Sequence, residues 1–184
     1  RTLVQLRSSQ AFATFAGQRL VLRRSDHRGE RAGGGGVVLD PAPLRGARGR
    51  LWFTAEDARG RVRGLVEQAA HAGATTGALT RRCAAEDGVA ACLVELLAER
   101  AIVRADAPGG ERFFAASVLE EATLAVRARI EALHDDKPLL VGISAAELTT
   151  RCPPRFAALV PLALAALVER GELVARDGLH RTPS

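Results

Sequence analysis

The sequence predicts a mixed α+β protein, mainly α, in which a partial antiparallel β-barrel is followed by two similar helical units. Three observations indicate this fold class. Apolar and polar residues alternate through much of residues 2–39, the spacing changes to that of helices after residue 59, and short sequences recur about 70 residues apart. The 184 residues are enough for one domain or two small ones.

The first forty residues have the pattern of short β-strands. Alternation runs through residues 2–7 and 17–23, and a third apolar run at 37–39 follows four consecutive glycines. Three short strands are too few to close a barrel or a sandwich. We therefore expect residues 1–43 to be one part of a barrel or sandwich domain, with an exposed strand edge through which two copies could dimerise.

A first helical unit is assigned to residues 59–117, after a linker at 44–58 that is indicated by the prolines, glycines and arginines of residues 40–50. Two short strands that meet at Pro108–Gly110 give a hairpin signal at its end. Three helices closed by a hairpin is the element order of a winged-helix domain. The apolar positions that define the helices are Val62, Leu65, Val66 and Ala69; Leu79 to Cys83; and Val89, Cys92, Leu93, Leu96 and Leu97.

A second helical unit is assigned to residues 118–184 and repeats this order, so the chain is predicted to contain two tandem winged-helix (helix-turn-helix) domains. Ser144 and Glu147 form a capping box, in which the hydroxyl and the carboxylate satisfy free N–H groups at a helix start. Pro161 lies where the third helix should be continuous, so that helix either begins there or is kinked. Asp177–Gly178 marks the closing hairpin. The first helix of this unit is indicated by Leu119, Val126, Ile130 and Leu133.

Two local matches support an internal duplication. Residues 79–83 resemble residues 148–152 at an offset of 69, and residues 97–100 resemble residues 167–170 at an offset of 70. Each repeat is therefore about 70 residues long.

The composition indicates a cytoplasmic protein that binds no membrane. No apolar run approaches the roughly 18 residues of a membrane span, and the N-terminus has no signal-peptide pattern. Cys83, Cys92 and Cys152 lie among apolar residues without a C-x-x-C pair, so we expect reduced thiols in the core.

Positive charge is concentrated near the N-terminus. Residues 1–50 hold ten arginines and three acidic residues, a net charge of +7, whereas residues 51–118 and 119–184 each have a net charge of −1. This distribution predicts that an anionic partner binds the N-terminal region.

Two parts of the chain resemble a known family. Residues 17–23 and 31–41, which end in Gly-Gly-Gly-Gly-Val-Val-Leu-Asp-Pro, resemble the closing strands of the third domain of EF-Tu-like factors, in the variant seen in selenocysteine-specific translation elongation factors (SelB). Residues 136–148 resemble the start of that family's second winged helix. Gly33 stands where the family has a β-branched residue, so we expect this strand to be less regular.

The resemblance implies a fragment of such a factor that covers the end of the EF-Tu-like barrel and the first two winged-helix domains. Its partners would be selenocysteinyl-tRNA, held through the barrel, and SECIS mRNA and the ribosome through the full-length factor. The winged helices would space the GTPase body from distal SECIS-binding domains. GTP and Mg²⁺ would be cofactors of the parent protein only, because this chain contains no G-x-x-x-x-G-K-[ST] loop.

The candidate RNA-binding residues form a basic loop between two expected strands. Arginines on such a loop can neutralise backbone phosphates without reading sequence, although the same residues could be a merely solvated basic loop. Arg45, Arg48 and Arg50 could extend the patch. The candidate residues are Arg23, Arg24, His27, Arg28 and Arg31.

Other chemistry is not indicated, so we expect no enzyme activity, cofactor, metal or small-molecule substrate. The glycines at 33–36 have no following lysine and enter a strand rather than a helix, so a tight barrel connection explains them better than a phosphate loop. The histidines at 27, 71, 134 and 180 are too scattered for a metal site or a general base. No serine or cysteine has a recognisable activating partner.

Two alternative functions remain open. A DNA-binding regulator needs basic or amide side chains along its third helices, but residues 88–99 and 157–169 contain no basic residue. A protein–protein scaffold would instead expose apolar residues on these helices, such as Leu93 with Leu97 or Leu164 with Val168.

Overall fold

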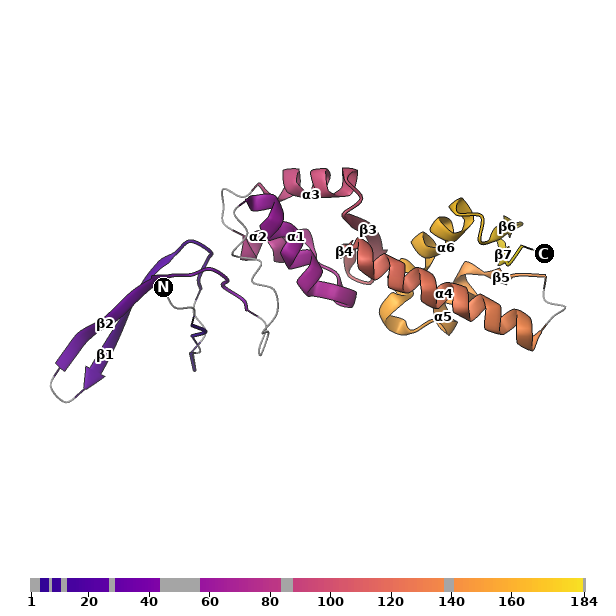
Figure 1. Cartoon of the computed structure of the whole chain (residues 1–184). Helices are drawn as coiled ribbons and strands as arrows, with labels where there is room; N and C mark the ends of the chain where they lie inside the picture. The colour runs from indigo at the N-terminus through magenta and orange to yellow at the C-terminus, as the bar shows by residue number, and fades with distance from the viewer. Residues whose placement is uncertain are drawn as a thin grey trace.

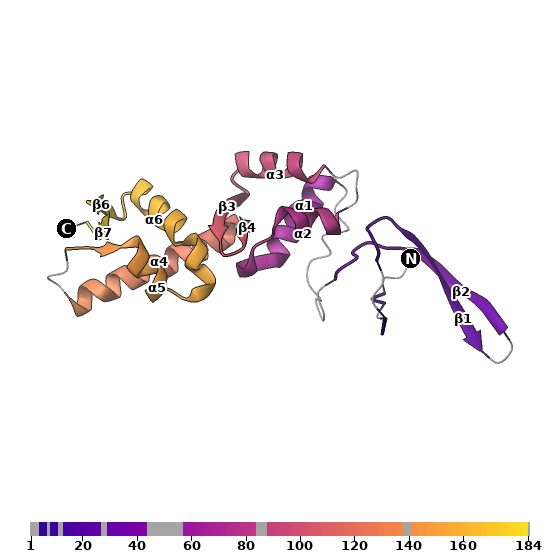
Figure 2. The ribbon, with the colours of Figure 1, turned by 180° about the vertical axis from the view of Figure 1, so that it is seen from behind.

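The computed structural model describes residues 4–6, 8–10, 13–26, 29–43, 57–83, 88–137 and 141–183. The molecule is elongated, with a β-hairpin at one end, two helical units after it and the C-terminus at the other end (Figure 1). The view from behind shows the same order (Figure 2). The described part contains six α-helices, two 3-10 helices and three small antiparallel sheets, which confirms the mixed α+β class.

The N-terminal part is a two-stranded hairpin. β1 (Arg19–Asp26) pairs with β2 (Gly29–Val37), and the backbone N–H groups of Gly17 and Val38 extend the ladder with hydrogen bonds of 2.8 Å. Residues 4–6, inside the first expected strand, are not in a strand. Over the described ranges no further strand joins this hairpin and no barrel closes. The expected partial barrel is therefore represented here by one hairpin, and Val21 and Val37 remain 67% and 52% exposed because no second layer covers them.

The sequence analysis predicts that the glycine run connects two strands. The structure places the run inside β2 instead. β2 begins at Gly29, eight residues before the apolar run at Val37 that marks the expected strand. Glycine is depleted in strands, so the pattern concealed this one. Leu22 is opposite Gly34 and Arg23 is opposite Ala32, which leaves Gly33 outside the register as a bulge. The expected irregularity at Gly33 is thereby confirmed.

The first unit is built from three helices and a hairpin. Asp57 and Thr75 cap the first two helices, with side chains that accept hydrogen bonds from Gly60 N and Ala78 N. Ala74 forms a short bridge with Phe113, so a third strand-like segment joins the hairpin. The elements are α1 (Ala58–Ala69), the 3-10 helix η2 (Ala70–Ala72), α2 (Thr76–Arg82), α3 (Val89–Ala98), β3 (Ile102–Ala107) and β4 (Gly110–Ala115).

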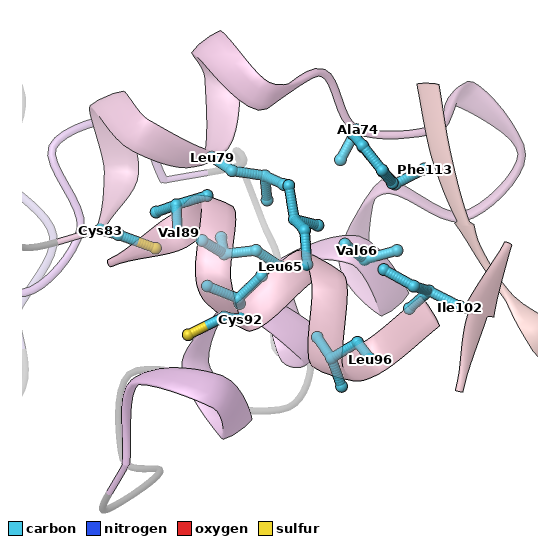
Figure 3. Close-up of a cluster of buried hydrophobic side chains, with 12 residues drawn as sticks. Leu65, Val66, Ala74, Leu79, Cys83, Val89, Cys92, Leu96, Ile102 and Phe113 are labelled. Carbon is cyan, nitrogen blue, oxygen red and sulfur yellow. The ribbon is translucent and has the colours of Figure 1, made fainter. Parts of the chain in front are cut away.

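The core of the first unit lies between its three helices and its hairpin (Figure 3). Side chains from each of these elements converge there, and each fully buried Leu or Phe contributes about 1.5–3 kcal/mol. The predicted apolar positions are confirmed as core residues, except that Ala69 and Leu97 are only partly buried and pack against the cluster. The main members are Val62, Leu65, Val66, Leu79, Cys83, Val89, Cys92, Leu93, Leu96, Ile102 and Phe113.

The second unit repeats the order of the first. Ser144 caps its second helix as predicted, and its Oγ accepts a hydrogen bond from Glu147 N at 3.2 Å. The Glu147 carboxylate pairs with Arg151. The third helix begins at Val160, so Pro161 stands in its first turn and the first of the two expected alternatives holds. The elements are α4 (Ala116–Asp136), β5 (Ile143–Ser144), α5 (Ala145–Arg151), the 3-10 helix η4 (Pro154–Leu159), α6 (Val160–Glu169), β6 (Val174–Arg176) and β7 (Leu179–Arg181), with sheet order β5-β7-β6.

The two units correspond at offsets that change along the repeat. Thr75 and Ser144 cap equivalent helices at the predicted offset of 69. At the ends of α3 and α6, however, the residues in the left-handed conformation are Arg100 (φ 56°) and Gly171 (φ 72°), which differ by 71. The offset of 70 predicted from residues 97–100 and 167–170 is therefore wrong by one residue. The left-handed residue fixes where each helix ends, and the similar residues before it do not.

A third apolar cluster joins the two units. α4 begins directly after β4, so the boundary predicted between residues 117 and 118 falls inside this helix. Phe114 of β4 is 1% exposed and lies in one cluster with Phe156 and Leu159 of η4. The other buried members are Ala105, Ala115, Val118 and Ala122. The units thus share a packed junction in place of a free linker.

Candidate nucleic-acid interface

The structure places most of the predicted RNA-binding residues in strands. Arg23 and Arg24 lie in β1 and Arg31 lies in β2, whereas His27 and Arg28 lie outside the described residues. Arg24 and Arg31 are direct backbone partners in the ladder. The connection is therefore shorter than the predicted basic loop, because the strands continue to Asp26 and resume at Gly29.

The ladder brings these arginines together at the end of the hairpin that lies farthest from the helical units (Figures 1 and 2). Arg23 is exposed on β1 towards this end, whereas Arg19, which is also exposed, lies opposite Val37 at the other end of the ladder. Phosphate binding without sequence readout requires several cations on an accessible surface, and this end of the molecule supplies the positions. Arg45, Arg48 and Arg50, which were expected to extend the patch, lie outside the described residues.

The helical units, in contrast, hold many of their arginines in ion pairs. Both partners are usually part-exposed, so each pair adds little to stability, but together the acidic partners offset the charge of these arginines. A hydrogen bond to Glu131 is the main cause that raises the pKa of Arg127, and one to Glu120 raises that of Arg170. The pairs are Arg59–Glu99, Arg63–Glu67, Arg104–Glu111, Arg127–Glu131, Arg127–Glu172, Arg151–Glu147 and Arg170–Glu120.

The third helices do not present a surface suited to reading DNA. The exposed positions of α3 include Ala90, Val94 and Glu95, and those of α6 include Ala165 and Glu169. Neither helix contains a basic residue, so neither offers the bidentate donors that recognise base edges.

The apolar surface expected for a protein scaffold is present only in part. Leu93 and Leu164 are 4% and 2% exposed because they face the cores of their units, so they do not form the exposed patch that the scaffold alternative requires. Val168 is exposed and lines an open groove of about 540 Å³ between α6 and the β6–β7 hairpin. The groove is lined by Ala145, Pro161, Leu164, Ala165, Val168, Glu169, Ala175 and His180.

His180 closes one side of this groove. Its Nδ1 atom is buried and has no hydrogen-bond partner within the described part of the chain. Burial lowers the pKa of His180 below its usual value, because an apolar environment disfavours the charged imidazolium. A neutral ring at this position keeps the groove apolar.

The remaining candidate residues have structural environments. His71 Nε2 lies 2.9 Å from Glu121 Oε2, and His134 Nδ1 lies 3.0 Å from Thr182 Oγ1. In the described ranges no three histidine, cysteine or acidic side chains gather as metal ligands would. The three cysteines are buried, as predicted, and burial raises the pKa of Cys152. None of the helices that the structure describes has the length and apolar character needed to cross a bilayer.

Residues 127–180 match the family model for the winged helix of elongation factor SelB. This segment is therefore similar to a SelB winged helix. It runs from the middle of α4 to β7 and so covers most of the second unit, without the hairpin or the first unit. No curated protein matches the chain.

The sequence analysis did not predict two features of the structure, a groove and a buried ion pair. One is the groove beside His180, which depends on how β6–β7 packs against α6. The other is an ion pair between Asp40 and Arg82, which lie 42 residues apart in the chain. Neither has a local sequence signal, since each depends on tertiary contacts.

Proposed function

We propose that this chain is a non-catalytic part of a cytoplasmic selenocysteine-specific elongation factor. Its basic hairpin would help to hold selenocysteinyl-tRNA. Its two helical units would space the GTPase body of the factor from distal domains that bind SECIS mRNA. The observation that carries the proposal is the SelB winged-helix match over residues 127–180, on a unit with the order helix, strand, helix, helix, hairpin.

The first unit is proposed to be a winged helix of the same kind. Its order is helix, bridge, helix, helix, hairpin, and its second helix has the same type of cap as that of the second unit. The Cys83 and Cys152 C-caps have nearly identical backbone angles, with φ of −81° and −79° and ψ of 158° in both. This local agreement supports a tandem duplication.

The packed junction supports the role of a spacer. A spacer must transmit a fixed distance and angle, and a buried contact between the units resists bending where an exposed linker would not. Inserting a flexible Gly-Ser segment between Ala115 and Ala116 of the full-length factor should lower selenocysteine incorporation. Affinity for selenocysteinyl-tRNA should not change, because the hairpin remains intact.

The tRNA contact is tested by charge reversal in the full-length factor. Replacing Arg23, Arg24 and Arg31 with glutamate should weaken selenocysteinyl-tRNA binding at least about ten-fold and make it less salt-dependent, because each lost phosphate contact removes about 0.7–0.9 from the slope of log K against log salt concentration. Arg104→Glu on β3, exposed and far from the hairpin, is the matched control and should leave binding unchanged. Unchanged affinity of the triple variant at low salt would remove the tRNA role.

A protein-binding role is the second candidate, and the groove between α6 and β6–β7 favours it. An apolar groove on a winged helix whose third helix lacks basic residues suits a protein better than a nucleic acid. Ala165→Asp would place a charge in this groove. Loss of ribosome or protein binding by that variant, with normal tRNA affinity, would support this candidate and not the tRNA role of the hairpin.

A further inference from the structure

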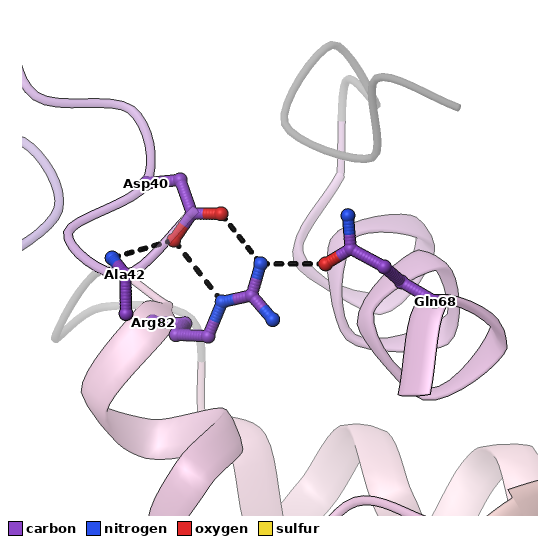
Figure 4. Close-up of polar contacts among 4 residues, drawn as sticks. All are labelled: Asp40, Ala42, Gln68 and Arg82. Carbon is purple, nitrogen blue, oxygen red and sulfur yellow. Dashed lines mark hydrogen bonds and ion pairs between the residues drawn. The ribbon is translucent and has the colours of Figure 1, made fainter. Parts of the chain in front are cut away.

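We infer that Asp40 and Arg82 form a polar latch that fixes the N-terminal hairpin on the first helical unit. Arg82 Nε donates to Asp40 Oδ1 at 3.0 Å, and Arg82 Nη2 donates to Asp40 Oδ2 at 2.5 Å (Figure 4). Two parallel bonds between a guanidinium and a carboxylate define the relative orientation of both groups as well as their distance. The contact therefore restrains rotation between the two parts.

Gln68 makes the latch a three-residue cluster. Arg82 Nη2 also donates to Gln68 Oε1 at 2.6 Å, so the guanidinium lies between the carboxylate and the amide (Figure 4). Gln68 is on α1 and Arg82 is the last residue of α2. A single aspartate from the N-terminal segment is thus tied to two helices of the first unit.

The latch is the most buried ion pair among the described pairs. The side chains of Asp40 and Arg82 are 6% and 16% exposed, whereas in the Arg104–Glu111 pair they are 62% and 44% exposed. A buried ion pair loses hydration on both groups and is often no more stabilising than apolar packing. Its distinguishing property is that only one geometry satisfies both partners, which suits a positioning role.

The carboxylate is held in place on the hairpin side as well. Asp40 Oδ1 accepts a hydrogen bond from Ala42 N at 3.0 Å, a local turn that includes Pro41. Two residues before Asp40, Val38 N donates to Gln18 O at 2.8 Å and so belongs to the hairpin ladder. Only a short, hydrogen-bonded segment therefore separates the ladder from the Asp40 carboxylate. The latch for this reason fixes the orientation of the hairpin relative to the first unit.

The two joints of the molecule differ in chemistry. The junction between the helical units is an apolar cluster, whereas the contact described between the segment after β2 and the first unit is a buried ion pair. Removing the charge of Asp40 should allow the hairpin to move relative to the first unit, while the apolar junction between the two helical units stays unchanged. This inference concerns the joint alone, and it holds whether or not the hairpin binds tRNA.

Distances between spin labels on the whole chain test the latch. Val21→Cys on β1 and Val94→Cys on α3 introduce labelling sites at positions that are each 67% exposed. The native cysteines are buried and should not react in the folded protein, which a labelling reaction on the parent chain checks. With the latch intact, we expect one narrow distance distribution.

Asp40→Asn in this doubly labelled protein should at least double the width of the distribution. Arg82→Gln should have the same effect, and the double variant should be no broader than either single variant, because both remove one interaction. Glu111→Gln breaks the exposed pair with Arg104 and should leave the width unchanged. Circular dichroism should show normal helix content for Asp40→Asn, since Asp40 lies outside the helices. A broad distribution in the parent protein, or an unchanged width in Asp40→Asn, overturns the inference.

Discussion

Gly73 lies against the ring of Phe114 with no room for a side chain between them. A Cβ atom on residue 73 would lie 2.7 Å from both Cε1 and Cζ of the ring. Gly73 also has φ 65° and ψ 155°, a conformation that essentially only glycine adopts. The Phe114 ring also belongs to the cluster that joins the two units. Its contact with Gly73 therefore connects the turn after α1 to that junction.

Gly73→Ala should lower the free energy of unfolding by about 3 kcal/mol, the sum of backbone strain and overpacking against Phe114. Gly77→Ala is the matched control, because Gly77 is inside α2 and the nearest atom to an added Cβ is Arg81 Nη1 at 3.7 Å. That control should stabilise the protein by about 0.5–1 kcal/mol. Urea denaturation measures both. A loss below about 1 kcal/mol for Gly73→Ala would show that the turn relaxes.

Phe156→Ala should destabilise the junction. Phe156 is 2% exposed, its ring lies edge-on to His71 with centroids 5.2 Å apart, and the Arg155 guanidinium lies 4.8 Å from its centroid. Truncation of a buried phenylalanine costs about 3–5 kcal/mol. Hydrogen exchange should show the largest loss of protection in η4 and the first turns of α4. Leu124 on α4 is 65% exposed, so Leu124→Ala should change the free energy of unfolding by less than about 0.5 kcal/mol.

The helices of both units could be predicted because their apolar spacing and caps are local. Ser144 and Pro161 marked helix starts that the structure confirms. β2 was predicted too late in the chain, since its glycines carry no strand signal. Leu93 lies in the core as the spacing of its helix predicts, whereas the burial of Leu164 depends on the packing of α6 on α4, which spacing within a single helix does not show.

The candidate site could be predicted only as a segment. Its arginines are evident from charge, but their register across the hairpin depends on the bulge at Gly33. The Asp40–Arg82 contact could not be predicted, because nothing local links residues that are 42 positions apart. Long-range polar pairs of this kind follow from tertiary packing alone.

His180 should make the protein less stable in mild acid. Burial lowers its pKa in the folded state below 6.5, so the unfolded chain binds a proton to this residue more readily than the folded chain does. The free energy of unfolding therefore falls as the pH decreases from 6.5, the unfolded-state pKa, towards the lower pKa of the folded state. We expect His180→Gln to reduce the fall in unfolding free energy between about pH 7.5 and about pH 5.5. Ala175 is the cross-strand partner of His180, and Ala175→Ser adds no titrating group, so this variant should retain the full fall in unfolding free energy. If His180→Gln gave the same pH profile as the parent protein, His180 would not be the group responsible.

Duplex DNA should bind this chain only through the β1–β2 hairpin. α3 and α6 contain no basic residue, and Arg127 and Arg170 are paired with glutamates. In a gel-shift assay with random duplex at about 100 mM salt, the whole chain with Arg23, Arg24 and Arg31 changed to glutamate should give no shift. A shift that persists in this variant and disappears on further substitution of Arg176 and Arg181 by glutamate would place DNA binding on the β6–β7 hairpin. The chain would then be a DNA-binding protein that contacts the duplex through a β-hairpin, a mode that does not need a basic third helix.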